Sequence, residues 1–146
     1  MKEVEVKLQF ITPCLANNRH DTRDLFDKDK AGNVMMMPSW WKSILEYGAS
    51  ALNKHQDSVK EIRVHPVVDG VPKVYKRYWG NNQYKEHEAF LKDDVIGIKV
   101  LIPNTMPYKD LLDIFKLAGP YKGISPYRWD EGYGLFNVVS DYSDFQ

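Results

Sequence analysis

The chain has 146 residues, with 20 basic and 20 acidic side chains that sum to a formal net charge of zero. This length and a hydrophobic content of 43% predict one soluble globular domain over residues 1–146, and they exclude a disordered or collagen-like chain. The apolar runs are shorter than the ~20 residues that a membrane helix needs, so we expect no membrane partner.

The first predicted element is a strand over residues 4–10, where apolar and polar side chains alternate with period two. Residues 17–33 are polar, and a connection of this length within a compact domain is usually functional or mobile. Ser39, which follows Pro38, is predicted to cap a helix whose apolar face fades near residues 53–57.

A β-hairpin is predicted next in the chain. Residues 62–68 alternate, Asp69-Gly70 is a strong two-residue turn signal, and residues 71–79 form the returning strand. Residues 83–93 show no clear periodicity. A further strand is predicted over residues 96–102, where isoleucine and valine alternate with other side chains.

A second helix is expected after residue 103. Asn104 or Thr105 can cap its start, Gly119 is a natural stop at its end, and Pro120 is expected to block its continuation.

The last predicted elements are a loop over residues 121–134, a strand over 135–139 and a frayed tail over 140–146. Two helices within the order β–α–β–β–(β)–α–β predict an α+β sandwich of the split βαβ type, with both helices on one face of a largely antiparallel sheet. We therefore expect a ferredoxin-like fold.

The residues with chemical potential are few. The single cysteine, Cys14, excludes an intrachain disulfide and favours a reducing, cytoplasmic location; it is expected as a buried packing residue rather than a nucleophile. No metal or cofactor motif occurs, so we expect no cofactor. His20 lies beside Arg19 and could act as a general base on a ribose hydroxyl, although a surface histidine is the more frequent explanation.

Basic and aromatic residues are mixed in two segments, residues 73–79 and 122–129. Single-stranded nucleic acid is held by this combination, because cations pair with phosphates and rings stack on bases. The balanced total charge means that such a site must be a local patch. The alternative is ordinary strand propensity, which also favours aromatic residues.

The last predicted loop is rich in glycine, with Gly119, Gly123, Gly132 and Gly134 in close succession. Backbone N–H groups in such a loop can bind phosphate. A helix end followed by a tight strand entry is the alternative interpretation.

Two stretches together resemble the RAMP superfamily, the ferredoxin-like RNA-binding proteins of CRISPR systems. The first covers residues 24–45, a charged loop and glycine turn that lead to Met37-Pro38-Ser39 and then to Lys42 at the start of a helix. The family's glycine after the proline is absent here.

The second stretch covers residues 117–136 and is similar to the family's C-terminal glycine-rich loop. It contains Gly123, the basic residue Arg128 and the sequence Gly132-Tyr133-Gly134 before a strand. The resemblance covers about a third of the chain. We therefore expect the protein to be a reduced or stand-alone relative of the RAMP superfamily.

The resemblance implies a ferredoxin-like RNA-binding core with the glycine-rich loop near the RNA. Some members cleave RNA, either with an early histidine, for which His20 is the candidate, or with an aspartate of the early loop, for which Asp21 or Asp24 lies nearest.

The leading expectation is a module that binds single-stranded RNA or a ribonucleoprotein complex. The residues expected to contact nucleic acid are Arg19, Arg23, Trp40, Lys42, Lys122, Gly123, Tyr127, Arg128 and Trp129. One alternative is a protein-interaction module, for example a virus-borne mimic that inhibits a CRISPR complex, or a homo-oligomer. The other is an endoribonuclease that uses His20 or the carboxylates of Asp21 and Asp24.

Overall fold

The computed structural model describes residues 1–20, 23–124 and 132–141. The strands of this described part are β1 (Lys2–Phe10), β2 (Cys14–Leu15), β3 (Asn18–His20), β4 (Arg23–Leu25), β5 (Asp27–Lys28), β6 (Val34–Met35), β7 (Arg63–Asp69), β8 (Lys73–Tyr78), β9 (Tyr84–Phe90), β10 (Val95–Ile102) and β11 (Phe136–Val138). The helices are η1 (Pro38–Trp41), α1 (Lys42–Leu52), η2 (Ser58–Glu61) and α2 (Tyr108–Lys122). None of the helices in the described residues is both long enough and apolar enough to span a membrane.

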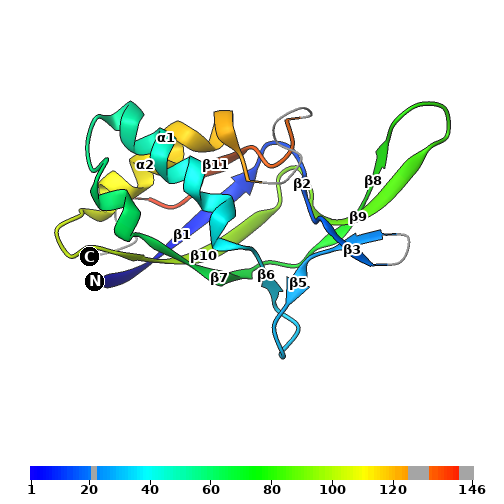
Figure 1. Ribbon diagram of the computed structural model, residues 1–146, viewed down its shortest axis with the longest axis horizontal. Helices are drawn as coiled ribbons and strands as arrows, with labels where there is room; N and C mark the ends of the chain where they lie inside the picture. Colours follow the sequence, from blue (N-terminus) through cyan, green and yellow to red (C-terminus); the bar gives the residue numbers. More distant parts are fainter. Residues whose placement is uncertain (21–22, 125–131, 142–146) are drawn as a thin grey trace.

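The main sheet has the strand order β11-β1-β10-β7-β6-β5, and every neighbouring pair in it is antiparallel. Its longest ladder joins β1 to β10, from the pair Lys2 and Ile102 to the pair Gln9 and Val95. Helices α1 and α2 lie together on one face of this sheet (Figure 1). The predicted α+β class, with two helices and antiparallel sheets, is therefore confirmed.

The helical layer and the sheet meet in a core that contains a group of aromatic rings. The period-two pattern of β1 directs Val4, Val6 and Leu8 toward the helices, and all three are buried. The ring of Phe136 on β11 packs edge-on against the rings of Phe10 and Trp41, with centroid distances of 6.5 and 6.4 Å.

A second sheet, with the order β2-β9-β4-β3, extends beyond the main one, and β8 pairs with β9. Strands β8 and β9 form a hairpin that projects from the body of the molecule (Figure 1). The buried end of β9 is fixed in the core, because Phe90 stacks on Phe10 and Phe26 at centroid distances of 5.9 and 5.2 Å.

The predicted hairpin around Asp69-Gly70 is wrong in its pairing. Strand β7 pairs with β10 in the main sheet, whereas β8 pairs with β9 in the second sheet, so the hairpin turn lies at residues 79–83. Gly70 serves close packing where the chain passes between the sheets: a Cβ atom there would lie 2.8 Å from Ile96 Cγ2 and 2.9 Å from the Phe90 ring. Residues 83–93, whose sequence shows no clear periodicity, contain β9.

The predicted end of the second helix is also wrong. Helix α2 continues through Pro120 and ends at Lys122. Gly123, whose φ is +63°, follows as its C-cap. Gly119 is required for packing, since a Cβ atom at this position would lie 2.5 Å from the carbonyl oxygen of Phe136. Because Pro120 stands in the last turn, its missing N–H removes a single bond near a helix end.

The predicted helix starts differ from the structure as well. Ser39 lies inside η1 and makes no cap, and the residue before α2 is Pro107 rather than Asn104 or Thr105. Residues 17–33 are not a plain connection, because they contain the short strands β3, β4 and β5.

The start of the predicted tail is anchored. Ser140 is buried, and its Oγ accepts a hydrogen bond from the backbone N–H of Lys7 at 2.7 Å. Residues 142–146 of that tail lie outside the described part of the chain.

Candidate functional site: the projecting hairpin

The β8–β9 hairpin exposes three large rings near its turn. The exposed fractions are 62% for Tyr78, 48% for Trp79 and 47% for Tyr84. Tyr78 and Tyr84 are directly paired across the hairpin, with ring centroids 5.3 Å apart. Rings that are exposed in this way cannot be explained by core packing, so they are available to a ligand.

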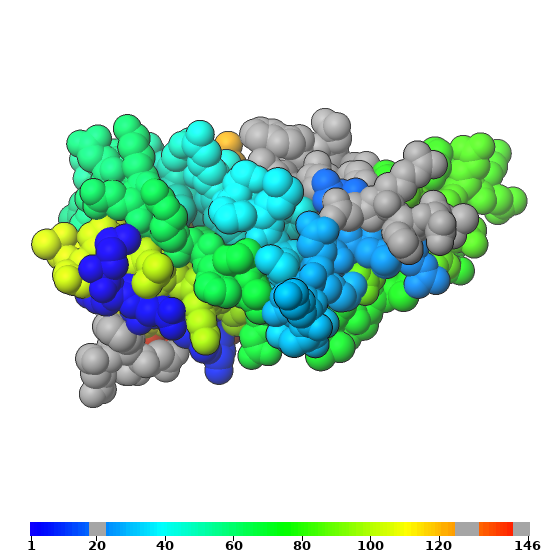
Figure 2. Space-filling view, turned by 60° about the horizontal axis from the view of Figure 1, so that its bottom comes forward, coloured from blue at the N-terminus to red at the C-terminus, as the bar shows by residue number. Residues whose placement is uncertain are grey.

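Two cations accompany these rings. Lys76 Nζ lies 4.9 Å from the centroid of the Tyr84 ring, and Arg77 Cζ lies 5.4 Å from that of Trp79. Because side chains alternate along a strand, Lys76 and Tyr78 occupy one face of the hairpin and Arg77 occupies the other. We call Lys76, Arg77 and the three exposed rings, which together cover both faces of the hairpin tip, the hairpin surface. Figure 2 shows the hairpin in green at one end of the molecule.

A buried polar cluster holds the base of the hairpin. Asp24 of β4 and His87 of β9 are both buried, and they are brought together by the parallel pairing of these strands. Lys85 Nζ lies 3.0 Å from Asp24 Oδ1, and Asp24 Oδ2 lies 3.4 Å from His87 Nδ1. The cluster therefore ties the early chain to the hairpin.

The hydrogen bonds of His87 define a neutral imidazole. Nδ1 lies 2.7 Å from the carbonyl oxygen of Ala16, which can only accept, so Nδ1 carries the proton. Nε2 then accepts a hydrogen bond of 3.2 Å from Arg77 Nε. Burial lowers the pKa of His87 and outweighs the hydrogen bond to Ala16 and the charge of Asp24, which act in the opposite direction; the positive charges of Arg77 and Lys85 lower it further.

Of the three candidate catalytic residues, the structure describes the side chain of Asp24 alone. The carboxylate of Asp24 is buried and paired with Lys85, so it does not face a substrate. Asp21 and the side chain of His20 lie outside the described residues. Among the residues that are described, no group of three or more histidine, cysteine or acidic side chains could hold a metal ion.

The predicted RNA-contacting residues of the described chain occupy several separate elements. Arg23 on β4 pairs with Glu86 of β9 at 3.5 Å, next to the base of the hairpin. Trp40 packs against the core, and Lys42 is exposed at the start of α1. Lys122 at the end of α2 lies 5.0 Å from the ring centroid of Tyr47. Tyr127, Arg128, Trp129 and the side chain of Arg19 lie outside the described part.

The described ends of the glycine-rich loop are closed by backbone hydrogen bonds. The N–H of Ile124 donates to Gly134 O at 2.9 Å, and the N–H of Gly134 donates to Pro13 O at 2.8 Å. These two donors are therefore used within the protein rather than left for a phosphate. Gly123 is buried against Gly134, and Cys14 is buried beside Ile124 as a packing residue, as predicted.

One contact joins the basic and aromatic segment of β8 to the end of the glycine-rich segment. The rings of Tyr75 on β8 and Tyr133 after the loop lie 5.8 Å apart edge-on, and their hydroxyl oxygens are 3.2 Å apart. The end of the glycine-rich segment is thus adjacent to the hairpin.

The open face of the main sheet, opposite the helices, has a different character. Glu3, Glu5 and Asp69 line a hollow of about 340 Å³ there, over Gly97. Lys99 and His65 line the same hollow, so carboxylates and basic side chains are mixed on this face, and in the described strands it carries no tyrosine, tryptophan or phenylalanine on which a base could stack.

The sequence does not single out Tyr84 or His87, and it indicates Tyr133 only as part of the glycine-rich stretch rather than as a neighbour of the hairpin. Tyr84 lies in the segment without periodicity, and only the turn between it and Tyr78 could have indicated their pairing. Comparison with known proteins adds no assignment: no protein-family model matches the chain, and neither does any curated protein.

Proposed function

We propose that this protein binds single-stranded RNA, alone or within a ribonucleoprotein complex, and that the hairpin surface is its principal contact. The observation that carries this proposal is the exposure of Tyr78, Trp79 and Tyr84 beside Lys76 and Arg77 on a projecting hairpin. Bases stack on exposed rings whatever their sequence, while the cations pair with the backbone phosphates.

The remaining surfaces favour this choice. The open sheet face mixes the carboxylates of Glu5 and Asp69 with Lys99 and offers no tyrosine or tryptophan in its hollow, so it lacks the combination of rings and cations that the hairpin surface has. Tyr133 lies against Tyr75, so a strand of RNA on the hairpin would pass close to the glycine-rich segment. Arg23, beside the hairpin base, is a further phosphate contact in this proposal.

A ferredoxin-like fold and a relationship to the RAMP superfamily form part of the same proposal. Their support is the strand order β11-β1-β10-β7, with α1 in the connection from β1 to β7 and α2 in the connection from β10 to β11. Of the two sequence stretches that resemble the family, the first leads into the start of α1, and the second begins in the last turns of α2 and, after residues that are not described, ends in β11.

The test is a fluorescence-anisotropy titration with a labelled oligouridine of about twenty nucleotides at low salt. The double variant Tyr78→Ala/Tyr84→Ala should lose about tenfold or more in affinity, since each stacked base contributes ~1–3 kcal/mol. Lys76→Glu should also reduce the dependence of affinity on salt. The matched controls, Tyr121→Ala on α2 and Lys92→Glu, should bind like the wild type.

Two results would contradict the proposal. The first is the absence of wild-type binding at protein concentrations of about 100 µM, which covers the usual range of non-specific affinity. The second is equal affinity for wild type and the double tyrosine variant, which would place any RNA site elsewhere on the molecule.

A further inference from the structure

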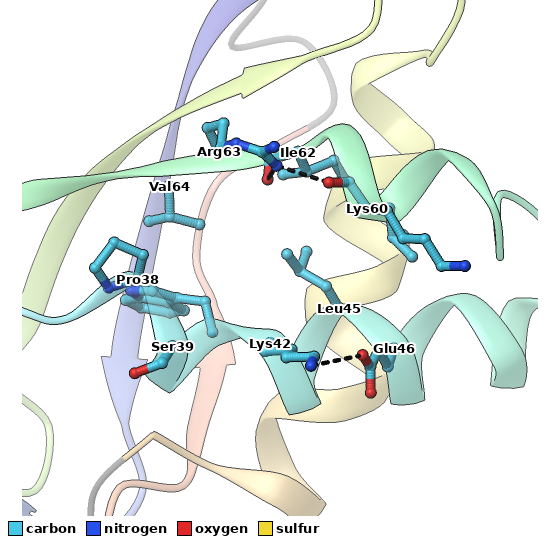
Figure 3. A pocket seen from close by; sticks show the side chains of 11 residues that line it. Pro38, Ser39, Lys42, Leu45, Glu46, Lys60, Ile62, Arg63 and Val64 are labelled. Atoms are coloured by element: carbon cyan, nitrogen blue, oxygen red, sulfur yellow. Dashed lines mark hydrogen bonds and ion pairs between the residues drawn. The ribbon is translucent and has the colours of Figure 1, made fainter.

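A groove opens between the start of α1 and the segment that runs from η2 into β7. It has a volume of about 390 Å³, comparable to pockets that accept a ligand or an anchoring side chain. Figure 3 shows Leu45 pointing into the space between the two banks, with Lys42 and Glu46 on one bank and Lys60 and Arg63 on the other. We call this feature the α1 groove.

The floor of the α1 groove is aliphatic. Leu45, Val59, Ile62 and Val64 retain exposed fractions of 4 to 7%, whereas the neighbouring core residue Ile44 is completely buried. The floor is therefore formed by core side chains that reach the surface of the groove. An apolar side chain seated there would remove the remaining exposed aliphatic atoms from water, which favours binding.

The rim of the groove carries more positive than negative charge. Lys42 is exposed and has only a weak contact with Glu46, at 4.0 Å. Arg63 is held in place because its Nη1 donates to the carbonyl oxygens of Lys60 and Ile62, at 2.6 and 3.0 Å. These bonds fix the guanidinium but do not neutralise its charge, so three cations and one carboxylate surround the floor.

We propose that the α1 groove is a docking site for an acidic peptide segment of a partner protein, with one large aliphatic or aromatic side chain flanked by carboxylates. The apolar anchor would occupy the space over Leu45 and Ile62. The carboxylates on either side of it would face Lys42 on one bank and Lys60 and Arg63 on the other.

The same geometry argues against nucleic acid in this groove. The one ring in its wall is that of Trp41, which is buried and packs edge-on against Phe115 and Phe136 at centroid distances of 6.1 and 6.4 Å. No face of this ring is open to a base. An aliphatic floor selects an apolar side chain, and the surrounding cations select its acidic neighbours.

The experiment starts with the full chain and a random-peptide library displayed on phage. Selected peptides should contain aspartate or glutamate on both sides of Leu, Ile, Met or Phe. A synthetic fluorescent copy of the most enriched peptide is then titrated against the wild type and against Lys42→Glu/Lys60→Glu, both of which change exposed residues. The double variant should bind about tenfold more weakly, since two rim attractions become repulsions.

A matched control is Lys30→Glu/Lys92→Glu, which makes the same change of net charge at exposed positions away from the groove and should keep wild-type affinity. Selection of no peptide, selection of peptides without carboxylates, or equal binding by wild type and groove variant would each overturn the proposal. So would a tenfold loss of oligouridine affinity in the groove variant without loss in the control, because it would assign the groove to nucleic acid. The hairpin variants, which do not touch this groove, report on RNA binding separately.

Discussion

The contact between α1 and α2 gives a sharp test of the packing. A Cβ atom added at Gly48 would overlap the carbonyl oxygen of Ile114 and lie 2.6 Å from its Cγ2. Overpacking a core position costs ~1–3 kcal/mol. The obstructing carbonyl belongs to the backbone of α2 and cannot rotate away, so we take the upper value of about 3 kcal/mol. Alanine recovers about 1 kcal/mol of helix propensity. We therefore expect Gly48→Ala to destabilise the protein by about 2 kcal/mol, which lowers Tm by about 4–8 °C.

Urea unfolding followed by far-ultraviolet circular dichroism measures this difference directly. Gly97→Ala is the matched control, since its new Cβ atom would lie 3.6 Å from Asp69 Cβ, an ordinary contact. Alanine in a strand is favoured over glycine by roughly 0.5–1 kcal/mol, so the control should equal or exceed the wild type in stability. A Gly48→Ala protein as stable as the wild type would refute the close approach of the two helices.

Two further predictions concern buried groups. Because burial lowers the pKa of His87, the unfolded chain binds a proton that the folded chain does not, and stability should fall as pH decreases below about 6.5. The slope can reach about 1.4 kcal/mol per pH unit, and it should be smaller in His87→Gln when urea unfolding is repeated at several pH values. Burial raises the pKa of the Cys14 thiol, so Ellman's reagent should react slowly with the folded protein and rapidly in denaturant. Rapid reaction of the native protein would show that Cys14 is accessible.

The sequence predicts best those elements in which the alternation of apolar and polar residues follows the burial of their side chains. The strands around Val6 and Ile98 alternate in period two, and both residues are completely buried at the centre of the sheet. Gly119 and Pro120, in contrast, have the form of a local stop signal, but the glycine is there to admit Phe136 against the helix. Tertiary packing therefore overrides the local signal at the end of α2.

The candidate site could be predicted only where its residues are contiguous. The basic and aromatic character of β8 is visible in the sequence, and the structure places Lys76, Arg77 and Tyr78 on an exposed hairpin. The pairing of Asp24 with His87 depends on a parallel contact between β4 and β9, for which no local pattern exists. Local turn chemistry at Asp69 likewise could not show that the adjoining strands enter different sheets.

Strand β9 connects the exposed tip of the hairpin to the centre of the protein. Its Tyr84 end is in solvent, whereas its Phe90 end is clamped between the rings of Phe10 and Phe26. The packing of Phe90 in the core therefore sets the direction in which the hairpin projects. A partner that binds the exposed end of the hairpin meets side chains whose orientation is already fixed, so less conformational entropy is lost on association.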